Sequence, residues 1–165
     1  MATSSLPTIT ALPESTRSLL RSSVVIPSLP SVLLELVQNS LDARATSINV
    51  FVNLDRWSIK CEDDGCGFSR EELGLLGRER YWTSKVGADR EDDVETFGFR
   101  GEALASLADI ALLEVLTKRE RDGGESYSLV VKGGKLAFEG VAKTKRTAGG
   151  TTVWARDIFY KVCLR

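Results

Sequence analysis

Residues 31–43, SVLLELVQNSLDA, indicate an amphipathic helix in which Ser31 serves as the N-terminal cap. At about 100° per residue, Glu35, Asn39 and Asp42 fall on one narrow polar stripe of that helix. The opposite half carries the apolar residues Leu33, Leu36, Val37 and Leu41. A carboxylate, a carboxamide and a second carboxylate therefore share one face, backed by an apolar surface.

Two explanations of this polar stripe remain open. A solvated helix face is the commoner one when periodicity is the only information. The alternative is a functional site, because the carboxylate of Glu35 can accept a proton from water. The amide oxygen of Asn39, one turn away, can ligate a hard cation such as Mg²⁺.

Two alternating segments follow the helix and predict a β-hairpin with a tight turn near residues 55–56. The alternating positions are Ile48, Val50, Val52 and Leu54, then Trp57, Ile59, Cys61 and Asp63. Asp63 is in phase with apolar neighbours, so we expect its carboxylate to face the interior, where it needs a hydrogen-bond donor. A purine amino group is one candidate donor; an ordinary Asp-Gly turn is the alternative. Gly65 and Gly67 permit close approach of a ligand to the backbone.

The remaining pattern predicts an α/β (α+β) sandwich, with helices on one face of a largely antiparallel sheet. Helices are expected near residues 14–22, from Ser69 over SREELGLL, and at Glu102–Ala111. Strands are expected near residues 126–132, 135–142 and 151–156, as a meander with Gly-Gly turns. We expect one domain over residues 9–165, preceded by a disordered tail at 1–8.

Three short motifs offer phosphate contacts. The segment FGFRGE at 97–102 joins a glycine-rich loop to a helix N-terminus, where free backbone N–H groups favour anions. A plain helix-start turn is the alternative. The hydroxyls and ammonium of TSK at 83–85 suit phosphates, and GGTT at 149–152 is a strand-opening turn that does not exclude a contact. The chain has no GxxxxGK[ST] motif, which excludes a P-loop, and GCGFSR lacks the third glycine of a dinucleotide fingerprint.

Composition excludes several classes of function. The chain has 165 residues with 22 basic and 23 acidic side chains, which suits one globular domain without bulk attraction to nucleic acid. It contains no histidine, which excludes Ser-His-Asp, Cys-His and HExxH sites. Its three cysteines show no CxxC spacing, so we expect no disulfide framework and a reducing intracellular compartment. We expect no membrane span and no secretory signal.

The order of these motifs resembles the GHKL ATPases, which include gyrase, Hsp90-type chaperones, sensor kinases and MutL. Within that superfamily, GFRGEALASL at 98–107, ELVQNSLDA at 35–43 and TSK at 83–85 resemble MutL, the mismatch-repair ATPase. The segments at 9–29, 80–85 and 107–111 resemble the eukaryotic third MutL-homologue type. The resemblance implies the Bergerat-type ATP-binding fold, with helices on one face of a mostly antiparallel mixed sheet.

The resemblance also implies a division of labour around ATP and Mg²⁺. Asp63, with an ordered water, holds the adenine amino group. Asn39 ligates Mg²⁺, and Glu35 orients and deprotonates the attacking water as the catalytic residue. The loop at 86–97 is the expected lid. The other implied nucleotide contacts are Gly65, Gly67, Thr83, Ser84, Lys85, Gly98, Phe99, Arg100, Gly101 and Thr152.

By the same resemblance, ATP acts as a switch for N-terminal dimerisation in DNA mismatch repair, DNA-damage processing and meiotic recombination. The implied partners are another MutL homologue, as a heterodimer, and mismatched or recombining DNA; the implied location is the nucleus. Two departures matter. Asp64 replaces the usual Asn and adds negative charge near the nucleotide. The ending VCLR at 162–165 stands where the family has a Pro-Ala-Arg pattern, so we expect an N-terminal fragment without the second ATPase subdomain and the C-terminal dimerisation domain.

Several alternatives stay open. We expect ATP hydrolysis by the full-length protein and leave turnover by this stretch alone undecided. A nucleotide-dependent interaction module without hydrolysis is the first rival, and another GHKL branch, of the topoisomerase or chaperone type, is the second. A basic strip for DNA is a third idea, although a solvated face is favoured. That strip comprises Lys143, Lys145, Arg146, Arg156, Lys161 and Arg165.

Overall fold

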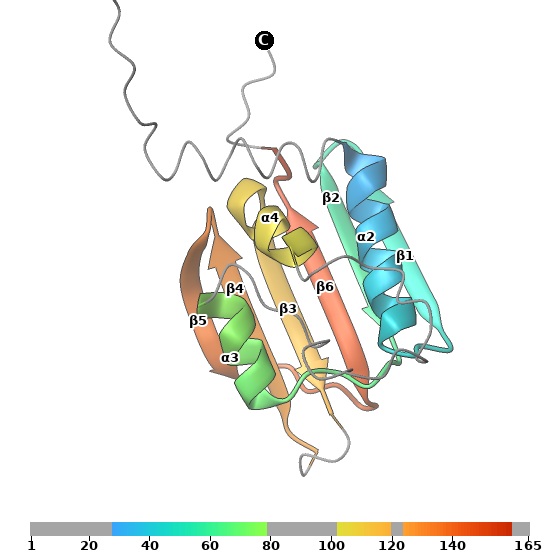
Figure 1. The fold of residues 1–165 in the computed structure, drawn as a ribbon, viewed down its shortest axis with the longest axis vertical. Helices are drawn as coiled ribbons and strands as arrows, with labels where there is room; N and C mark the ends of the chain where they lie inside the picture. Colours follow the sequence, from blue (N-terminus) through green and yellow to red (C-terminus); the bar gives the residue numbers. More distant parts are fainter. Residues whose placement is uncertain (1–27, 79–101, 120–123, 160–165) are drawn as a thin grey trace, which may run out of the picture.

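In the part of the chain that the structure describes, three helices cover one face of a six-stranded sheet (Figure 1). The computed structural model describes residues 28–78, 102–119 and 124–159. The helices are α2 (Leu29–Asp42), α3 (Arg70–Arg78) and α4 (Glu102–Ile110). The strands are β1 (Ile48–Asn53), β2 (Ser58–Asp63), β3 (Leu112–Lys118), β4 (Ser126–Lys132), β5 (Lys135–Val141) and β6 (Gly150–Arg156). The expected sandwich is confirmed, with every pairing between described strands antiparallel. The expected tail at 1–8 and helix at 14–22 lie outside the described residues.

The N-cap of helix α2 lies three residues before the predicted cap, Ser31. Ser28, with extended backbone, is the N-cap, and its hydroxyl oxygen accepts a hydrogen bond from the backbone N–H of Ser31 at 3.4 Å. Pro30 is tolerated in the first turn because the N–H that it lacks has no partner within the helix there. The prediction that Ser31 caps the helix is therefore wrong.

The buried face of α2 is narrower than its hydrophobic pattern suggests. Val32, Leu36 and Ser40 are buried against the sheet, whereas Leu41 is 47% exposed. Successive buried positions are four residues apart, which gives a stripe along the helix axis. Leu41 thus lies on the apolar half of the helix without being buried, and a polar residue, Ser40, occupies the end of the buried stripe nearest Asp63.

One of the two middle strands of the sheet, β3, was not expected from the sequence. In the order β1-β2-β6-β3-β4-β5, strand β3 is a central strand that pairs with both β6 and β4. Strand β6 lies between β2 and β3, so Val153 faces Cys61 on one side and Val115 on the other. The prediction that the last third forms a meander is wrong for this reason; only β4 and β5 are joined as a hairpin of the expected kind.

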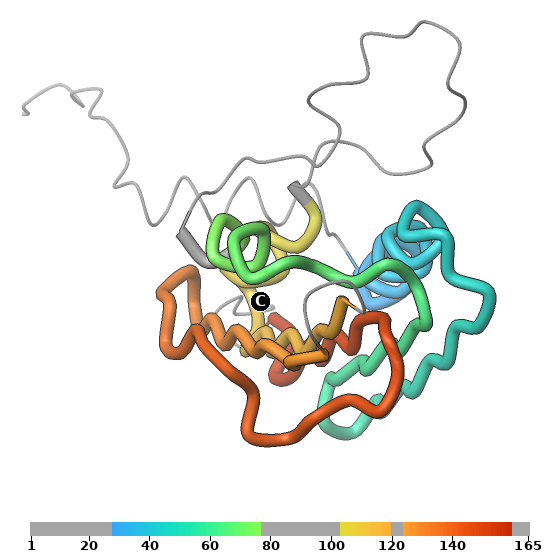
Figure 2. Tube along the Cα trace, turned by 90° about the horizontal axis from the view of Figure 1, so that it is seen from below, coloured from blue at the N-terminus to red at the C-terminus, as the bar shows by residue number. Residues whose placement is uncertain are grey.

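The sheet has one buried face and one open face. Seen from below, the helices lie on one side and the connection between β5 and β6, residues 142–149, arches away on the other (Figure 2). On the open face, one row runs in register across all six strands: Phe51, Lys60, Trp154, Glu114, Val130 and Phe138. The guanidinium of Arg156 lies 4.2 Å from the centre of the Trp154 ring. The open face is therefore amphipathic, while the core lies on the helical side.

Asp64 fixes the corner between α2 and β1. One oxygen of its carboxylate accepts hydrogen bonds from the backbone N–H groups of Thr46 at 2.7 Å and Ser47 at 2.8 Å. The other oxygen accepts from the Thr46 hydroxyl at 2.7 Å. These donors favour the ionised form, so they lower the pKa of Asp64 from its ordinary value of 3.8.

Replacing Leu113 should reveal which face of β3 carries the core. Leu113 is 1% exposed on the helical side, so Leu113→Ala should lower the free energy of unfolding by about 2–5 kcal/mol. Leu116→Ala, a matched change on the open face of the same strand, should lower the free energy of unfolding clearly less than Leu113→Ala does. Urea denaturation of both variants measures the two losses; equal losses would contradict a one-sided core.

Replacing Asp64 by Asn should remove part of the pH dependence of stability. The amide can keep the bonds to both N–H groups but not the charge. Because the pKa of Asp64 is lowered in the folded state, the Asp64 carboxylate contributes to the free energy of unfolding above pH 3.8. This contribution is lost as the pH falls through the pKa of the folded state. The stability gap between wild type and Asp64→Asn should thus be widest near neutral pH and close in acid. Denaturation curves at several pH values measure it, with Asp55→Asn as the control; a constant gap would contradict the assignment.

Candidate functional site

The centre of the candidate site is the carboxylate of Asp63, at the end of β2. This side chain is 8% exposed. One oxygen, Oδ1, accepts hydrogen bonds from the backbone N–H groups of Gly65 at 2.9 Å and Thr151 at 3.1 Å. The other oxygen, Oδ2, accepts from the hydroxyl of Ser40 at 3.1 Å. The expected inward orientation of Asp63 is thus what the structure shows, with donors from three separate segments.

The carboxylate of Asp63 keeps one acceptor position. An ionised carboxylate offers about four lone-pair sites, two on each oxygen. The two N–H groups occupy both sites on Oδ1. Ser40, whose hydroxyl oxygen also lies 3.1 Å from the carbonyl oxygen of Leu36, occupies one site on Oδ2 when it donates to Asp63. The remaining site on Oδ2 can accept an N–H from a bound molecule.

The loop after Asp63 is locked against the end of α2. The backbone N–H of Cys66 donates to the carbonyl oxygen of Ala43 at 3.0 Å. A Cβ at Gly65 would lie 2.8 Å from both the Cβ and the carbonyl oxygen of Ala43. Gly67 has φ +68°, and a Cβ there would lie 2.4 Å from the carbonyl oxygen of Lys118. The chain's own backbone thus fills the space that these glycines open, which accounts for them without a ligand.

Glu35 and Asn39 lie one turn apart on α2, and Ser40, the neighbour of Asn39, reaches Asp63. Both side chains are partly buried. Neither makes a hydrogen bond or an ion pair with another residue in the described ranges. Burial raises the pKa of Glu35 above its ordinary value of 4.5, because the charged form loses solvation. A partly desolvated acid without a partner is a common property of functional sites.

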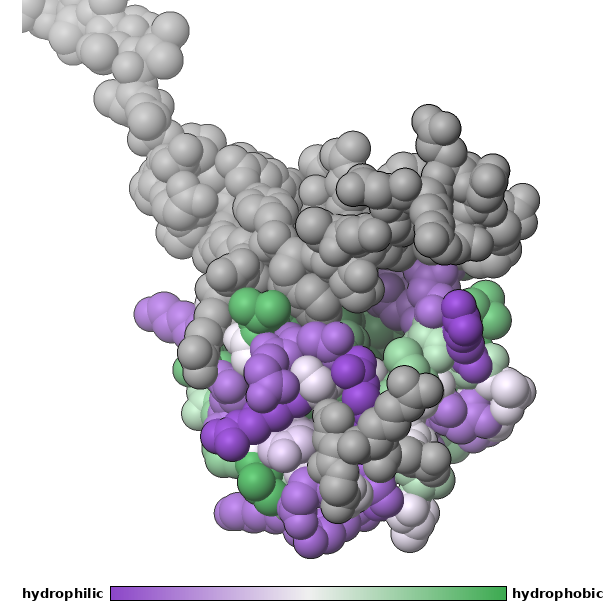
Figure 3. Space-filling model, turned by 60° about the horizontal axis from the view of Figure 1, so that its bottom comes forward, coloured by the Kyte–Doolittle hydropathy of each residue, from purple (hydrophilic) through white to green (hydrophobic). Residues whose placement is uncertain are grey.

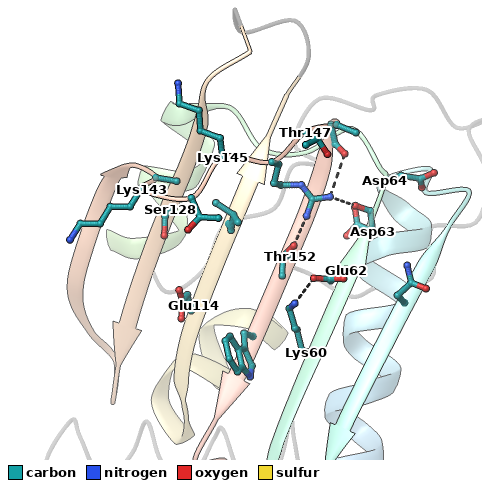
Figure 4. Close-up of a pocket in the computed structure, with 18 of the residues that line it drawn as sticks. Lys60, Glu62, Asp63, Asp64, Glu114, Ser128, Lys143, Lys145, Thr147 and Thr152 are labelled. Atoms are coloured by element: carbon teal, nitrogen blue, oxygen red, sulfur yellow. Dashed lines mark hydrogen bonds and ion pairs between the residues drawn. The ribbon is translucent and has the colours of Figure 1, made fainter.

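The structure does not bring Thr152 to Asp63. Alternation along β6 turns Thr151 to the buried side and Thr152 to the open face, where the guanidinium of Arg146 donates to its hydroxyl (Figure 4). On the buried side, the backbone N–H of Thr151 reaches the carboxylate of Asp63. The phase of Thr151 with Val153 and Ala155 is the signal that could have indicated this.

A second buried hydroxyl that the sequence did not indicate supports the same region. Thr117 is 0% exposed, and its hydroxyl oxygen accepts from the backbone N–H of Phe68 at 2.8 Å. The same oxygen lies 3.3 Å from the hydroxyl of Thr151 and 3.3 Å from the carbonyl oxygen of Gly150. Thr117 therefore links the loop after Asp63 to the start of β6.

The remaining expected contacts lie outside the described residues. They are Thr83, Ser84, Lys85, Gly98, Phe99, Arg100 and Gly101, together with the expected lid at 86–97.

Two of the four described residues of the expected basic strip form ion pairs with acidic side chains. Several of its residues border a hollow of about 890 Å³ on the open face. Lys145 pairs with Glu125 at 3.3 Å, and Arg156 pairs with Glu114. Seen from the lower end of the view in Figure 1, hydrophilic side chains dominate the described surface, with small separate apolar patches (Figure 3). Acidic residues also line the hollow, so its described part is not uniformly positive; Lys161 and Arg165 lie outside the described ranges.

Two broader features concern membranes and metals. None of the helices in the described ranges has the length and apolar character to cross a bilayer. The same ranges contain no group of three His, Cys, Asp or Glu side chains placed to hold a metal ion.

Known proteins are similar to this chain in sequence and in fold. The sequence model of the histidine kinase-, DNA gyrase B-, and HSP90-like ATPases matches residues 27–145. The DNA mismatch repair protein MLH3 of Arabidopsis thaliana is 48% identical over 161 residues, covering 96% of this chain and 14% of that protein. The DNA mismatch repair protein MutL of Thermotoga maritima is 40% identical, covering 95% of this chain and 30% of that protein. The chain thus spans less than a third of these two relatives.

Two solved structures agree with the fold. The N-terminal domain of a DNA repair protein has a TM-score of 0.68 and 31% identity, covering 88% of this chain and 40% of that one. The MutL ATPase domain of Aquifex aeolicus, complexed with ADP, has a TM-score of 0.63 and 25% identity, and the match covers 84% of this chain and 45% of that one. The resemblance inferred from the motifs is confirmed: the chain belongs to the histidine kinase-, DNA gyrase B- and HSP90-like ATPase family and is similar there to the N-terminal ATPase domain of MutL-like mismatch-repair proteins.

Proposed function

We propose that this chain binds Mg²⁺-ATP and provides the nucleotide-binding part of a MutL-like mismatch-repair ATPase. The observation that carries the proposal is the buried Asp63 carboxylate with one acceptor site left, on the strand that α2 covers with Asn39 and Glu35. These residues fit the nucleotide and its metal, since Asp63 keeps one acceptor site and the side chains of Glu35 and Asn39 have no hydrogen-bond partner among the described residues. The ADP complex of the related MutL domain supports the same ligand class.

The carboxylate of Asp63 would favour adenine over guanine. Its free site on Oδ2 can accept a hydrogen from the exocyclic amino group of adenine. Guanine presents a keto oxygen at the corresponding ring position, which would place two acceptors against each other. A site built around a buried acceptor rejects such a base because a polar pair is left unsatisfied.

Asn39 suits a metal held mainly by phosphates. Mg²⁺ prefers oxygen ligands and is commonly held by one or two protein oxygens together with substrate phosphates. The amide of Asn39 makes no hydrogen bond with the described residues, so its oxygen is available. The bound metal supplies charge neutralisation on the phosphates, and Asn39 supplies its position.

Glu35 suits the role of general base. Burial raises the pKa of Glu35, which makes its carboxylate a stronger base than that of an exposed glutamate. Accepting a proton from a positioned water is typically worth about 10²–10⁴ in rate. Positioning and electrostatic stabilisation contribute the rest in phosphoryl transfer.

The wider function follows from the relatives named as mismatch-repair proteins. In this proposal ATP acts as a switch for pairing with another MutL homologue and for engaging mismatched or recombining DNA, in the nucleus. The similarity to the Arabidopsis MLH3 protein supports the third MutL-homologue type. If the full-length protein binds ATP but does not hydrolyse it, the alternative function, a nucleotide-dependent interaction module without hydrolysis, would be favoured.

Replacing Glu35 should separate binding from turnover. In a form of the protein that hydrolyses ATP, Glu35→Gln should lower turnover by about 10²–10⁴ and keep the affinity for a non-hydrolysable ATP analogue. In the wild type, turnover should rise with pH through a value above 4.5, because the pKa of Glu35 is raised. Phosphate release and isothermal titration measure the two properties. Glu71→Gln, on the exposed start of α3, is the control; unchanged turnover in Glu35→Gln would contradict the role.

Replacing Asn39 should abolish metal-dependent nucleotide binding. Asn39→Ala removes the oxygen proposed for Mg²⁺, so isothermal titration with the analogue should show no binding in the presence of Mg²⁺. Gln38→Ala removes a neighbouring amide that points away from the sheet on the helical wheel and should bind like wild type. Affinity equal to wild type in Asn39→Ala would overturn the assignment.

A further inference from the structure

A guanidinium on the open face reaches the backbone of Asp63. Arg146 belongs to the connection between β5 and β6, and its Nη2 donates to the carbonyl oxygen of Asp63 at 2.7 Å (Figure 4). The same nitrogen lies 3.4 Å from the carbonyl oxygen of Gly149, and Nη1 donates to the hydroxyl of Thr152. One side chain thus joins the end of β2 to the start of β6.

Asp63 is therefore held from both faces of the sheet. On the helical side, Ser40, Gly65 and Thr151 orient its carboxylate. On the open side, Arg146 holds its carbonyl oxygen. Since the carbonyl group and the side chain share one Cα, fixing the former restricts the direction of the latter.

The junction between the two strands is also unusually tight. Gly150 has φ +116°, and a Cβ there would lie 2.1 Å from the carbonyl oxygen of Asp63. Nη2 of Arg146 lies 2.9 Å from that same Cβ position. The neighbouring Thr151 supplies the N–H that the carboxylate of Asp63 accepts. A shift of β6 away from β2 would therefore disturb the carboxylate directly.

The residue type and its anchoring suit this task. A planar guanidinium can donate to two acceptors in fixed directions, which a lysine ammonium does less well. Arg146 makes no ion pair with a carboxylate in the described ranges, so its two terminal nitrogens donate to neutral oxygens, while its buried Nε has no hydrogen-bond partner there. The backbone N–H of Arg146 also donates to the hydroxyl of the fully buried Ser126 at 2.9 Å, which fixes the start of the side chain.

We propose that Arg146 is a positioning residue for the nucleotide base: it holds the Asp63 backbone so that the carboxylate presents the remaining acceptor site of Oδ2 to an adenine amino group. The inference rests on the proposed role of Asp63 in nucleotide binding. Arg146 acts from the opposite face of the sheet and does not contact the nucleotide itself.

The test compares ligands with and without a base. Arg146→Lys should weaken binding of a non-hydrolysable ATP analogue by about tenfold or more, whereas Mg²⁺-tripolyphosphate, which lacks the base, should bind as to wild type. Thr152→Val, which removes one acceptor of the guanidinium, should show a smaller loss of the same kind. Lys143→Ala, on the same connection, should match wild type. Circular dichroism and thermal unfolding confirm that each variant is folded.

The outcomes distinguish this inference from the proposed function. Unchanged analogue binding in folded Arg146→Lys and Thr152→Val, with binding lost in Asp63→Asn, would overturn the role of Arg146 and leave the proposed function intact. Equal losses for the analogue and for tripolyphosphate would indicate only a structural role for Arg146. No binding of the analogue by wild type would remove the proposed function itself.

Discussion

The buried carboxylate of Asp63 is the interaction on which the described structure converges. A charge with 8% exposure is costly unless donors surround it. Those donors come from α2, from the loop after β2 and from the first residues of β6, which are distant in sequence. Satisfying one carboxylate therefore fixes the mutual position of a helix, a loop and a central strand. The same requirement leaves one oxygen with acceptor capacity for a ligand.

The parts of the fold that depend on local pattern could be predicted. The hairpin of β1 and β2 follows from strict alternation, and the same alternation places Asp63 inside. The family followed from the order of several motifs, none of which was specific alone. Among the candidate site residues in the described ranges, Thr152 lies on the face of the sheet opposite to the carboxylate of Asp63.

What could not be predicted depends on pairing between distant segments. Strand β3 follows α4 after one residue, so the apolar run gives no break between helix and strand. The choice between Thr151 and Thr152 depends on which face of β6 meets the helices, and that is fixed by pairing with β2 and β3. The role of Arg146 depends on carbonyl oxygens, which carry no sequence signal at all.

The place of β6 in the sheet has a consequence for synthesis of the protein. This strand is the last of the described strands in the chain, yet it lies between β2 and β3. On the ribosome, the earlier strands emerge without the segment that joins them, and chains elongate at about 5–20 residues per second. A nascent chain stopped before Gly150 would carry two separate β units with exposed edges. Chaperone capture of stalled nascent chains should therefore cease once residues 150–156 have left the exit tunnel.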